Sequence, residues 1–211
     1  MPMVEKDSNR RPLATRSAKW ANWLSAILVK SNISPNQISV LSIAPALVGA
    51  WLLLSSPLSA GMLVLTAICI QLRLLCNMLD GMVAIEGGKK SKLGVLYNEI
   101  PDRVADSLFI VALGYAIAMP WLGWLGALLA AKTAYIRVLG GANGLAQNFA
   151  GPMAKPHRMF VMTLGCLIAA AELHLNASNY ALTIAAYIIA VGSGITCVAR
   201  SLAIARQLKA Q

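Results

Sequence analysis

Long apolar segments alternate with short polar connections along most of the chain. Six of these segments approach or exceed the roughly 20 residues that an α-helix needs to cross a bilayer core of about 30 Å. We expect membrane-spanning helices near residues 37–55, 60–84, 94–118, 121–139, 158–173 and 179–199. Proline and glycine mark the connections, and no segment shows the alternation of a strand. The pattern predicts an all-α integral membrane protein with six transmembrane helices.

An amphipathic segment precedes the first span. Over residues 13–30, apolar positions that include Trp20 and Trp23 follow helical spacing, with basic residues mostly on the opposite side. This spacing predicts an interfacial helix that lies along the membrane surface, and a first core helix of the bundle is the alternative. We therefore divide the chain into a cytoplasmic N-terminal part, 1–33, and a transmembrane domain, 34–211.

The composition excludes an ordinary soluble domain. Hydrophobic residues make up 58% of the 211 residues and charged residues 12%, whereas soluble domains are about 45–50% apolar and about 25% charged. The formal net charge is +10, but the basic residues stand between the spans, so we expect anionic membrane lipids as partners and no nucleic acid. The four cysteines lie in apolar segments without zinc-site spacing and are interpreted as free thiols.

Lysine and arginine are concentrated in every second connection between the predicted spans, so they all fall on one side of the membrane. They are found in the N-terminal segment, after the second span, after the fourth span and at the C-terminus, while the opposite connections contain none. Short cytoplasmic loops carry the excess of Lys and Arg in membrane proteins. We expect both termini in the cytoplasm and place the protein in a bacterial inner membrane.

Charged and carboxamide residues are concentrated in the second and third spans. A charge at the centre of a membrane helix costs about 2.5–3.5 kcal/mol on insertion scales, so such residues indicate function. Arg73, Asn77 and Asp80 follow i, i+4, i+7 spacing, and Asn98 and Asp102 follow i, i+4 spacing. Because the connection between the two spans is short, we expect antiparallel neighbours whose polar faces meet at the cytoplasmic end.

Oxygen ligands of this kind suit Mg²⁺ or Mn²⁺ better than zinc or copper. A diphosphate bound through such a cation, with a carboxylate that accepts a proton from a hydroxyl group, would form a phosphoryl-transfer site. Gly81 and Gly94 would leave room for a ligand or for close helix approach. The competing class is a small cation-coupled membrane transporter. The position of the acidic cluster near one membrane face and the lack of paired broken helices weigh against it.

This region resembles the signature of the CDP-alcohol phosphatidyltransferase family, D-x2-D-G-x2-A-R-x8/9-G-x3-D-x3-D. The match is in register from residue 77 to residue 102, with these residues at signature positions: Asn77, Asp80, Gly81, Ala84, Gly94, Asn98 and Asp102. The resemblance implies that 34–211 is a catalytic domain that transfers a phosphatidyl group from CDP-diacylglycerol to a small alcohol and releases CMP, in phospholipid biosynthesis. It also implies a homodimer.

The resemblance also implies roles for individual residues. Asp102 would be the general base. Mg²⁺ or Mn²⁺ would be bound by Asn77, Asp80, Asn98 and Asp102. The CDP-lipid would be bound by Asp80, Gly81, Ala84 and Gly94.

Three positions depart from the signature. Asn77 and Asn98 replace aspartates, and Ile85 replaces an arginine. The loss of two negative charges should weaken metal binding unless other acids compensate, and Glu99 and Asp106 are the candidates. A catalytically degenerate family member, which binds CDP-lipid without turnover, is therefore an alternative to an active transferase.

A second basic group lies around the end of the fourth span and the start of the fifth. Arg137, Lys155 and Arg158 are candidates for holding the phosphate of a phosphorylated acceptor, as basic residues do in the family. For Lys155, contact with anionic lipid is an equal alternative. The sequence does not identify the acceptor alcohol.

Two charged residues also have a purely structural interpretation. Arg73 would pair with Asp80 or with a neighbouring carboxylate, and Asp106 would balance Arg103.

Overall fold

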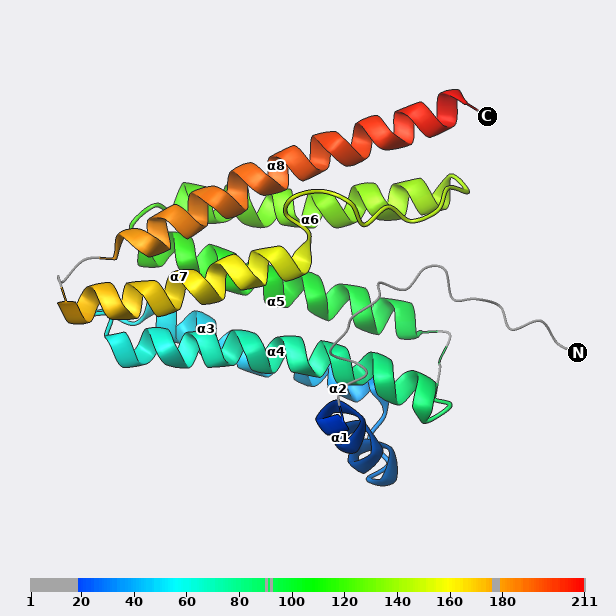
Figure 1. Ribbon diagram of the computed structural model, residues 1–211, viewed down its shortest axis with the longest axis horizontal. Coiled ribbons are helices and arrows are strands. Elements are labelled where there is room, and N and C mark those ends of the chain that lie inside the picture. The colour runs from blue at the N-terminus through cyan, green and yellow to red at the C-terminus, as the bar shows by residue number, and fades with distance from the viewer. Residues whose placement is uncertain (1–18, 90, 92, 176–178, 211) are drawn as a thin grey trace, which may run out of the picture.

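The computed structural model describes residues 19–210, apart from residues 90, 92 and 176–178. The described residues form helices and connections without a β-strand, as the apolar pattern predicts (Figure 1). The helices are α1 (Lys19–Lys30), α2 (Pro35–Leu41), α3 (Ile43–Leu54), α4 (Ala60–Glu86), α5 (Gly94–Ala116), α6 (Pro120–Ala142), α7 (Lys155–Leu175) and α8 (Tyr180–Lys209). The first part of the predicted amphipathic segment, up to residue 18, lies outside the described residues.

Five segments of the described chain are long and apolar enough to cross a membrane. They are Pro35–Leu54, which combines α2 and α3, and the helices α4, α6, α7 and α8. The sixth expected span corresponds to α5, which is 23 residues long but contains Glu99, Asp102, Arg103 and Asp106. These charges make α5 more polar than the five apolar segments, although its length is similar.

Helices α3 to α8 run roughly along one axis in an elongated bundle (Figure 1). Each of the six packs mainly against two others, and these pairs close a ring in the order α3, α4, α7, α8, α6 and α5. The side chains that point into this ring include the continuous core of Leu53, Leu63, Phe109, Met162 and Ile189.

The polar faces of the second and third spans, α4 and α5, meet as expected, since Arg73 and Asn77 of α4 both donate to Asp102 of α5. In the described chain α4 and α5 are not among the helix pairs with extensive contact, because α3 packs against both of them. Gly49 of α3 makes this possible: a Cβ atom there would lie 2.5 Å from the Phe109 ring of α5 and 3.1 Å from Cys69 of α4. The polar faces of α4 and α5 therefore meet through side chains, while the two backbones stay apart.

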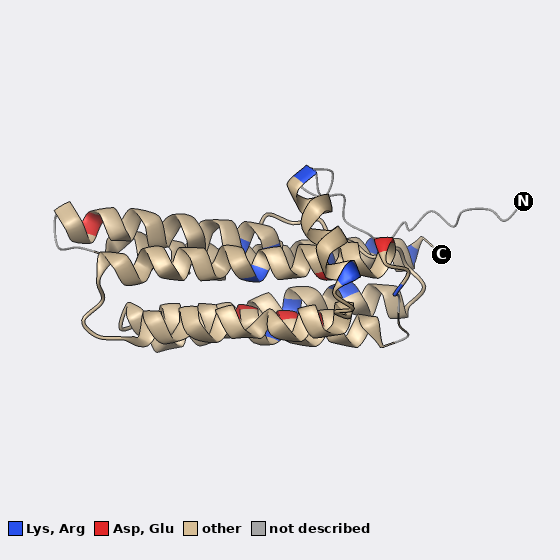
Figure 2. Ribbon diagram, turned by 90° about the horizontal axis from the view of Figure 1, so that it is seen from below, with Lys and Arg blue, Asp and Glu red and all other residues tan. Residues whose placement is uncertain are grey.

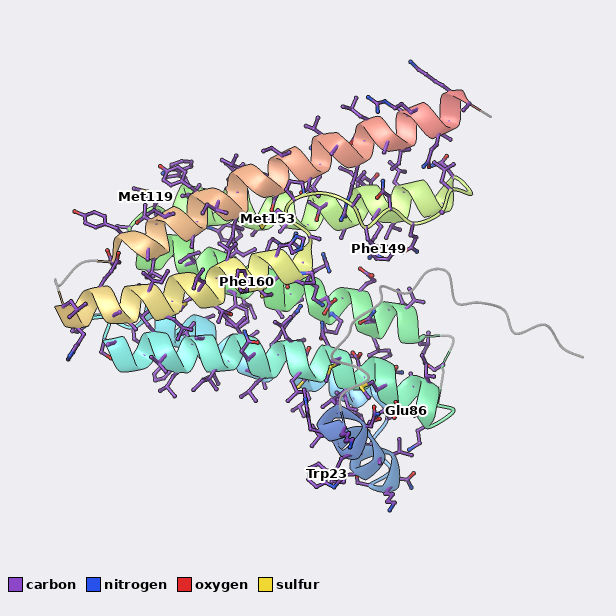
Figure 3. All side chains as sticks on the ribbon, in the orientation of Figure 1. Trp23, Glu86, Met119, Phe149, Met153 and Phe160 are labelled. Carbon is purple, nitrogen blue, oxygen red and sulfur yellow. The ribbon has the colours of Figure 1, made fainter. Side chains whose placement is uncertain are left out.

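Helices α1 and α2 close the bundle beside the end of α4. Ser34 caps α2 in a capping box with Gln37, and Pro35 is the first residue of the helix. Helix α1 packs against α4, and the Ser25 hydroxyl donates a 2.6 Å hydrogen bond to Glu86. Trp23 is 65% exposed and points away from the bundle (Figure 3).

The connection between α6 and α7 folds back over α8. Gly151 has a φ of +122°, a value that favours glycine, and a Cβ atom there would lie 2.5 Å from Thr196 of α8. The Met153 amide donates to the Thr196 hydroxyl, at 2.9 Å, and Met153 lies beside α8 (Figure 3). This connection fixes the position of Lys155, the first residue of α7.

Charged residues are unevenly distributed along the bundle. Figure 2 shows most of the lysine, arginine and acidic positions in the half of the bundle where α8 ends. The outer faces of the helices are apolar, and Trp51, Leu128, Val191 and Val198 are each more than half exposed. The apolar faces suit lipid, and the charges collect at one end of the interior.

Candidate active site

The charged end of the ring encloses one polar cavity of about 340 Å³. Five helices and the α6–α7 connection contribute to its lining. Its polar lining residues are Asn77, Asp80, Asn98, Glu99, Asp102, Arg103, Thr133, Arg137, Lys155, Arg158 and Arg200. The sequence placed the metal and CDP-lipid residues on two helices and the acceptor-phosphate candidates around the next two, and the structure brings α4, α5, α6, α7 and also α8 to one cavity.

Asp80 is positioned from the start of the first span. The Ser39 hydroxyl of α2 donates a 2.6 Å hydrogen bond to Asp80 Oδ2, and both residues are buried. Helix α2 packs against both α4 and α5. The hydrogen bond to Asp80 therefore holds the acidic face of α4 close to α2. Gly81 follows Asp80 and also lines the cavity.

Asp102 is surrounded by cationic and amide donors. Arg73 Nη2 lies 3.1 Å from Asp102 Oδ1, and the Asn77 amide also donates to Oδ1. Lys155 Nζ donates to Oδ2, and Arg103 Nη2 lies 3.7 Å from the same oxygen. Both oxygens of this carboxylate, which is 8% exposed, are therefore engaged.

Asp106 lies one helical turn deeper and outside the cavity lining. Its two oxygens pair with Arg73 Nη2 at 2.8 Å and with Arg158 Nη2 at 3.1 Å. The structural interpretation therefore holds in part, but the partners are Arg73 and Arg158, while Arg103 approaches Asp102. Arg73 bridges Asp102 and Asp106 and has no exposed side-chain surface.

The basic residues expected to hold an acceptor phosphate differ in their availability. Arg137 pairs with Glu99 and Gln147, and its guanidinium lies over the Phe149 ring at 5.1 Å. Arg158 is 1% exposed and also donates to the Met153 carbonyl at 2.8 Å. The Lys155 side chain is 21% exposed and faces the cavity.

Two of the four signature positions expected to bind metal carry a carboxylate, and the other two carry asparagine. Only Asp80 and Asp102 are acidic, and Asp102 already contacts Arg73 and Lys155. The part of the chain that the structure describes contains no group of three or more His, Cys, Asp or Glu residues arranged to hold a metal. The two acids proposed to compensate are paired elsewhere, Glu99 with Arg137 and Asp106 with two arginines.

The cavity brings together most of the residues that the sequence singled out. Those that line it are Asn77, Asp80, Gly81, Asn98, Glu99, Asp102, Arg137, Lys155 and Arg158. Ala84 and Gly94 do not line it, and the only atom near a Cβ at Gly94 is the Ser91 hydroxyl, 3.6 Å away. Their proposed contact with the CDP-lipid stays a prediction.

Sequence reasoning missed three contributors to the site. Ser39 holds Asp80, and Arg200 of α8 donates to the Thr133 carbonyl at 2.7 Å and to the Ala150 carbonyl at 2.8 Å, beside the cavity. Phe149, the third, stacks under Arg137. Of these three residues, Ser39 could have been noticed in the sequence, because it lies one helical turn after the proline at the start of α2.

The fold and the cavity define the class: an integral membrane bundle of apolar helices with one buried, charged site. The model of the CDP-alcohol phosphatidyltransferase family matches residues 32–199, and the chain belongs to this family. It is a membrane-bound phosphotransferase of phospholipid metabolism.

Named relatives and solved structures agree with this assignment. The chain is 26% identical to the phosphatidylinositol phosphate synthase of Mycobacterium marinum, over 90% of this chain and 82% of the relative. The same identity, 26%, is found with the phosphatidylinositol phosphate synthase of Corynebacterium glutamicum, over 84% of this chain and 80% of the relative.

Two crystal structures of the phosphatidylinositol phosphate synthase of Mycobacterium tuberculosis share the fold. The one with CDP-DAG bound has a TM-score of 0.75 and 23% identity and covers 89% of this chain and 94% of that chain. The one in complex with manganese and citrate has a TM-score of 0.74 and 22% identity and covers 87% of this chain and 88% of that chain.

Proposed function

We propose that the protein transfers the phosphatidyl group of CDP-diacylglycerol to the hydroxyl group of a small alcohol and releases CMP. The observation that carries this proposal is the single cavity in which Asp80, Gly81 and Asp102 meet Lys155. A diphosphate needs cationic and hydrogen-bonding groups, and a hydroxyl nucleophile needs a base within reach. One cavity supplies both at the charged end of an apolar bundle.

The transfer step uses Asp102 as the base. The acceptor oxygen forms a bond to the phosphorus that carries the diacylglycerol, and the bond from this phosphorus to the bridging oxygen of CMP breaks. The acceptor proton passes to Asp102, and CMP leaves with the electron pair of the broken bond. Arg73 and Asn77 hold the Asp102 carboxylate from its other side and orient it.

A divalent cation in the cavity would be Mg²⁺ or Mn²⁺, held by Asp80 and by the carbonyl oxygens of Asn77 and Asn98. Such an ion polarises phosphoryl oxygens as a Lewis acid. Ser39 supports this arrangement, because its hydrogen bond fixes the Asp80 carboxylate at the wall of the cavity.

We infer a phosphorylated alcohol as the acceptor. Three cavity-lining basic residues, Arg137, Lys155 and Arg158, come from α6 and α7, whereas Asp80 comes from α4. Both named relatives are phosphatidylinositol phosphate synthases, which suggests inositol phosphate as the first acceptor to test. Glycerol phosphate and free alcohols are the comparison set.

The topology proposed with this function has six spans, α5 included. On α5, Val95, Ile100 and Val104 are at least 40% exposed, while Asp102 and Asp106 are buried. An apolar outer face with inward charges is the pattern of a helix in lipid. Helix α1 would lie on the cytoplasmic surface of a bacterial inner membrane, with both termini in the cytoplasm, anionic lipid around the basic end and a second copy of the chain as partner.

The test is CMP release by purified protein in lipid nanodiscs, with labelled CDP-diacylglycerol, Mg²⁺ and each acceptor. Asp102→Asn should lower the rate at least about 100-fold, the lower end for a general base. Glu172→Gln, at the far end of α7, is the matched control and should keep the rate. An Asp102→Asn variant as fast as the unaltered protein would remove Asp102 from the reaction.

The alternatives give other outcomes in the same experiment. A degenerate family member would bind CDP-diacylglycerol but release no CMP with any acceptor; the replacement of two signature aspartates by Asn77 and Asn98 is the observation that favours it. A cation-coupled transporter would carry ions into liposomes and leave CDP-diacylglycerol intact.

A further inference from the structure

Lys155 occupies an unusual position for a basic residue in a site built on acidic signature positions. Its ammonium group donates to Asp102 Oδ2, on the cavity side of that carboxylate, while Arg73 binds the opposite oxygen from the protein interior. Arg73 does not line the cavity, whereas Lys155 and Asp102 do. Lys155 therefore lies closer to Asp102 than Arg103, the other cavity-lining cation near this carboxylate, and a bound ligand would meet it there.

The position of Lys155 is imposed by the fold. The connection before it is held by the hydrogen bond from the Met153 amide to Thr196 and by the Arg158 contact with the Met153 carbonyl, at 2.9 and 2.8 Å. Ala154, the preceding residue, is 4% exposed. The lysine stem thus starts from a fixed backbone and reaches across to Asp102 on α5.

The charge of the site agrees with this position. Around Asp102 and Asp106, the connected ion pairs involve four cationic residues: Arg73, Arg103, Lys155 and Arg158. Together with Asp80 there are three carboxylates, so cations already exceed acids. Aspartates at 77 and 98 alone would raise the carboxylates from three to five against these four cations. The two asparagines and Lys155 therefore change the charge of the site in the same direction.

We propose that the Lys155 ammonium takes the place of a divalent cation at Asp102, so that the site binds at most one metal ion and contacts the diphosphate of the CDP-lipid directly through lysine. An ammonium group has three N–H donors, and in the described structure one of those of Lys155 binds Asp102. The others can reach phosphate oxygens on the cavity side. The diphosphate contact rests on the proposed function, whereas the metal count does not.

The metal count is measured by Mn²⁺ titration of the purified full chain, followed by electron paramagnetic resonance. The unaltered protein should bind no more than one Mn²⁺ per chain. Lys155→Gln should bind Mn²⁺ at least tenfold more tightly or gain a second ion, and adding Asn77→Asp and Asn98→Asp should strengthen this further. Lys155→Arg, which keeps the charge, and Lys30→Met, which removes an exposed lysine of α1, should behave as the unaltered protein.

The lipid contact is measured as CDP-diacylglycerol binding in EDTA. Lys155→Gln should bind at least tenfold more weakly than the unaltered protein, and Mn²⁺ should restore the binding. Two Mn²⁺ ions per unaltered chain, or equal Mn²⁺ binding in Lys155→Gln and the unaltered chain, would overturn the proposal. Neither assay needs turnover, so a chain that releases no CMP leaves both results decisive. If Lys155→Gln does not fold, Asp102→Asn serves as the second variant: it removes a negative charge and frees the ammonium group from its carboxylate partner, so it should raise EDTA-resistant lipid binding. Unchanged or weaker binding would refute the role of this pair.

Discussion

The Ser39 hydroxyl of α2 donates a 2.6 Å hydrogen bond to the Asp80 carboxylate of α4, across 41 residues of sequence. Asp80 is 6% exposed, so this donor compensates for much of the water that the carboxylate loses on burial. The contact links the start of the first span to the signature residue in the second. It is one of the interactions that bring residues distant in the sequence together at the cavity.

Removal of this donor should weaken both the fold and the site. For Ser39→Ala we expect a loss of about 1–3 kcal/mol in the free energy of unfolding, because a buried charged acceptor loses its partner. CDP-diacylglycerol affinity should fall with it. Thermal unfolding in detergent and lipid titration measure the two effects.

The control for this substitution is Ser42→Ala. Ser42 is also buried, but its hydroxyl donates to the Ser39 carbonyl within the same helical segment, at 2.6 Å. Its removal should leave lipid affinity unchanged. Equal losses of affinity in the two variants would show that the Ser39 contact has no specific role at Asp80.

The buried pair of Asp106 and Arg158 should matter for stability more than for chemistry. Asp106→Leu leaves Arg73 and Arg158 buried without that carboxylate, and breaking a buried ion pair costs about 3–5 kcal/mol. We expect a lower unfolding temperature in detergent. The double variant Asp106→Leu with Arg158→Met should recover part of the loss, since it leaves fewer unpaired charges.

Arg206→Met is the control for the arginine substitution, because Arg206 lies exposed near the end of α8. It should unfold as the unaltered protein does. If the double variant is no more stable than Asp106→Leu alone, Asp106 and Arg158 do not stabilise the fold by neutralising each other.

The contact between α5 and α6 depends on two glycines. A Cβ atom at Gly114 would lie 2.5 Å from the Cα atom of Gly123, a distance that backbone atoms cannot tolerate. Gly114→Ala should therefore separate the helices and lower the free energy of unfolding by about 1–3 kcal/mol. Thermal unfolding and the fraction of folded protein after extraction measure this effect.

Gly61→Ala provides the matched comparison in α4. The nearest atom to a Cβ there is the Ser59 hydroxyl oxygen, at 4.0 Å, so alanine has room. Alanine also has a higher helix propensity than glycine, by about 1 kcal/mol. Stability equal to or above that of the unaltered protein is expected, and a Gly114→Ala variant that matches it would refute the steric argument.

The sequence by itself determined the helical class, the approximate spans and the location of the site. Apolar runs of membrane length leave helices as the structure that satisfies backbone hydrogen bonds within each segment, and this holds whatever the neighbours are. Helical spacing then placed Asn77 and Asp80 on one face and Asn98 and Asp102 on another. The in-register signature predicted the family, which the match over residues 32–199 confirms.

Only the tertiary structure decided how the helices pack and which charges pair. Local spacing carries no information on partners from distant segments: Gly49 lets α3 enter between α4 and α5, and Lys155 reaches Asp102 because a connection anchored on Thr196 ends beside the cavity. The acids at 99 and 106 look available from their spacing alone. In the bundle they bind arginines, because long-range ion pairs are chosen by proximity in space and not by position along a helix.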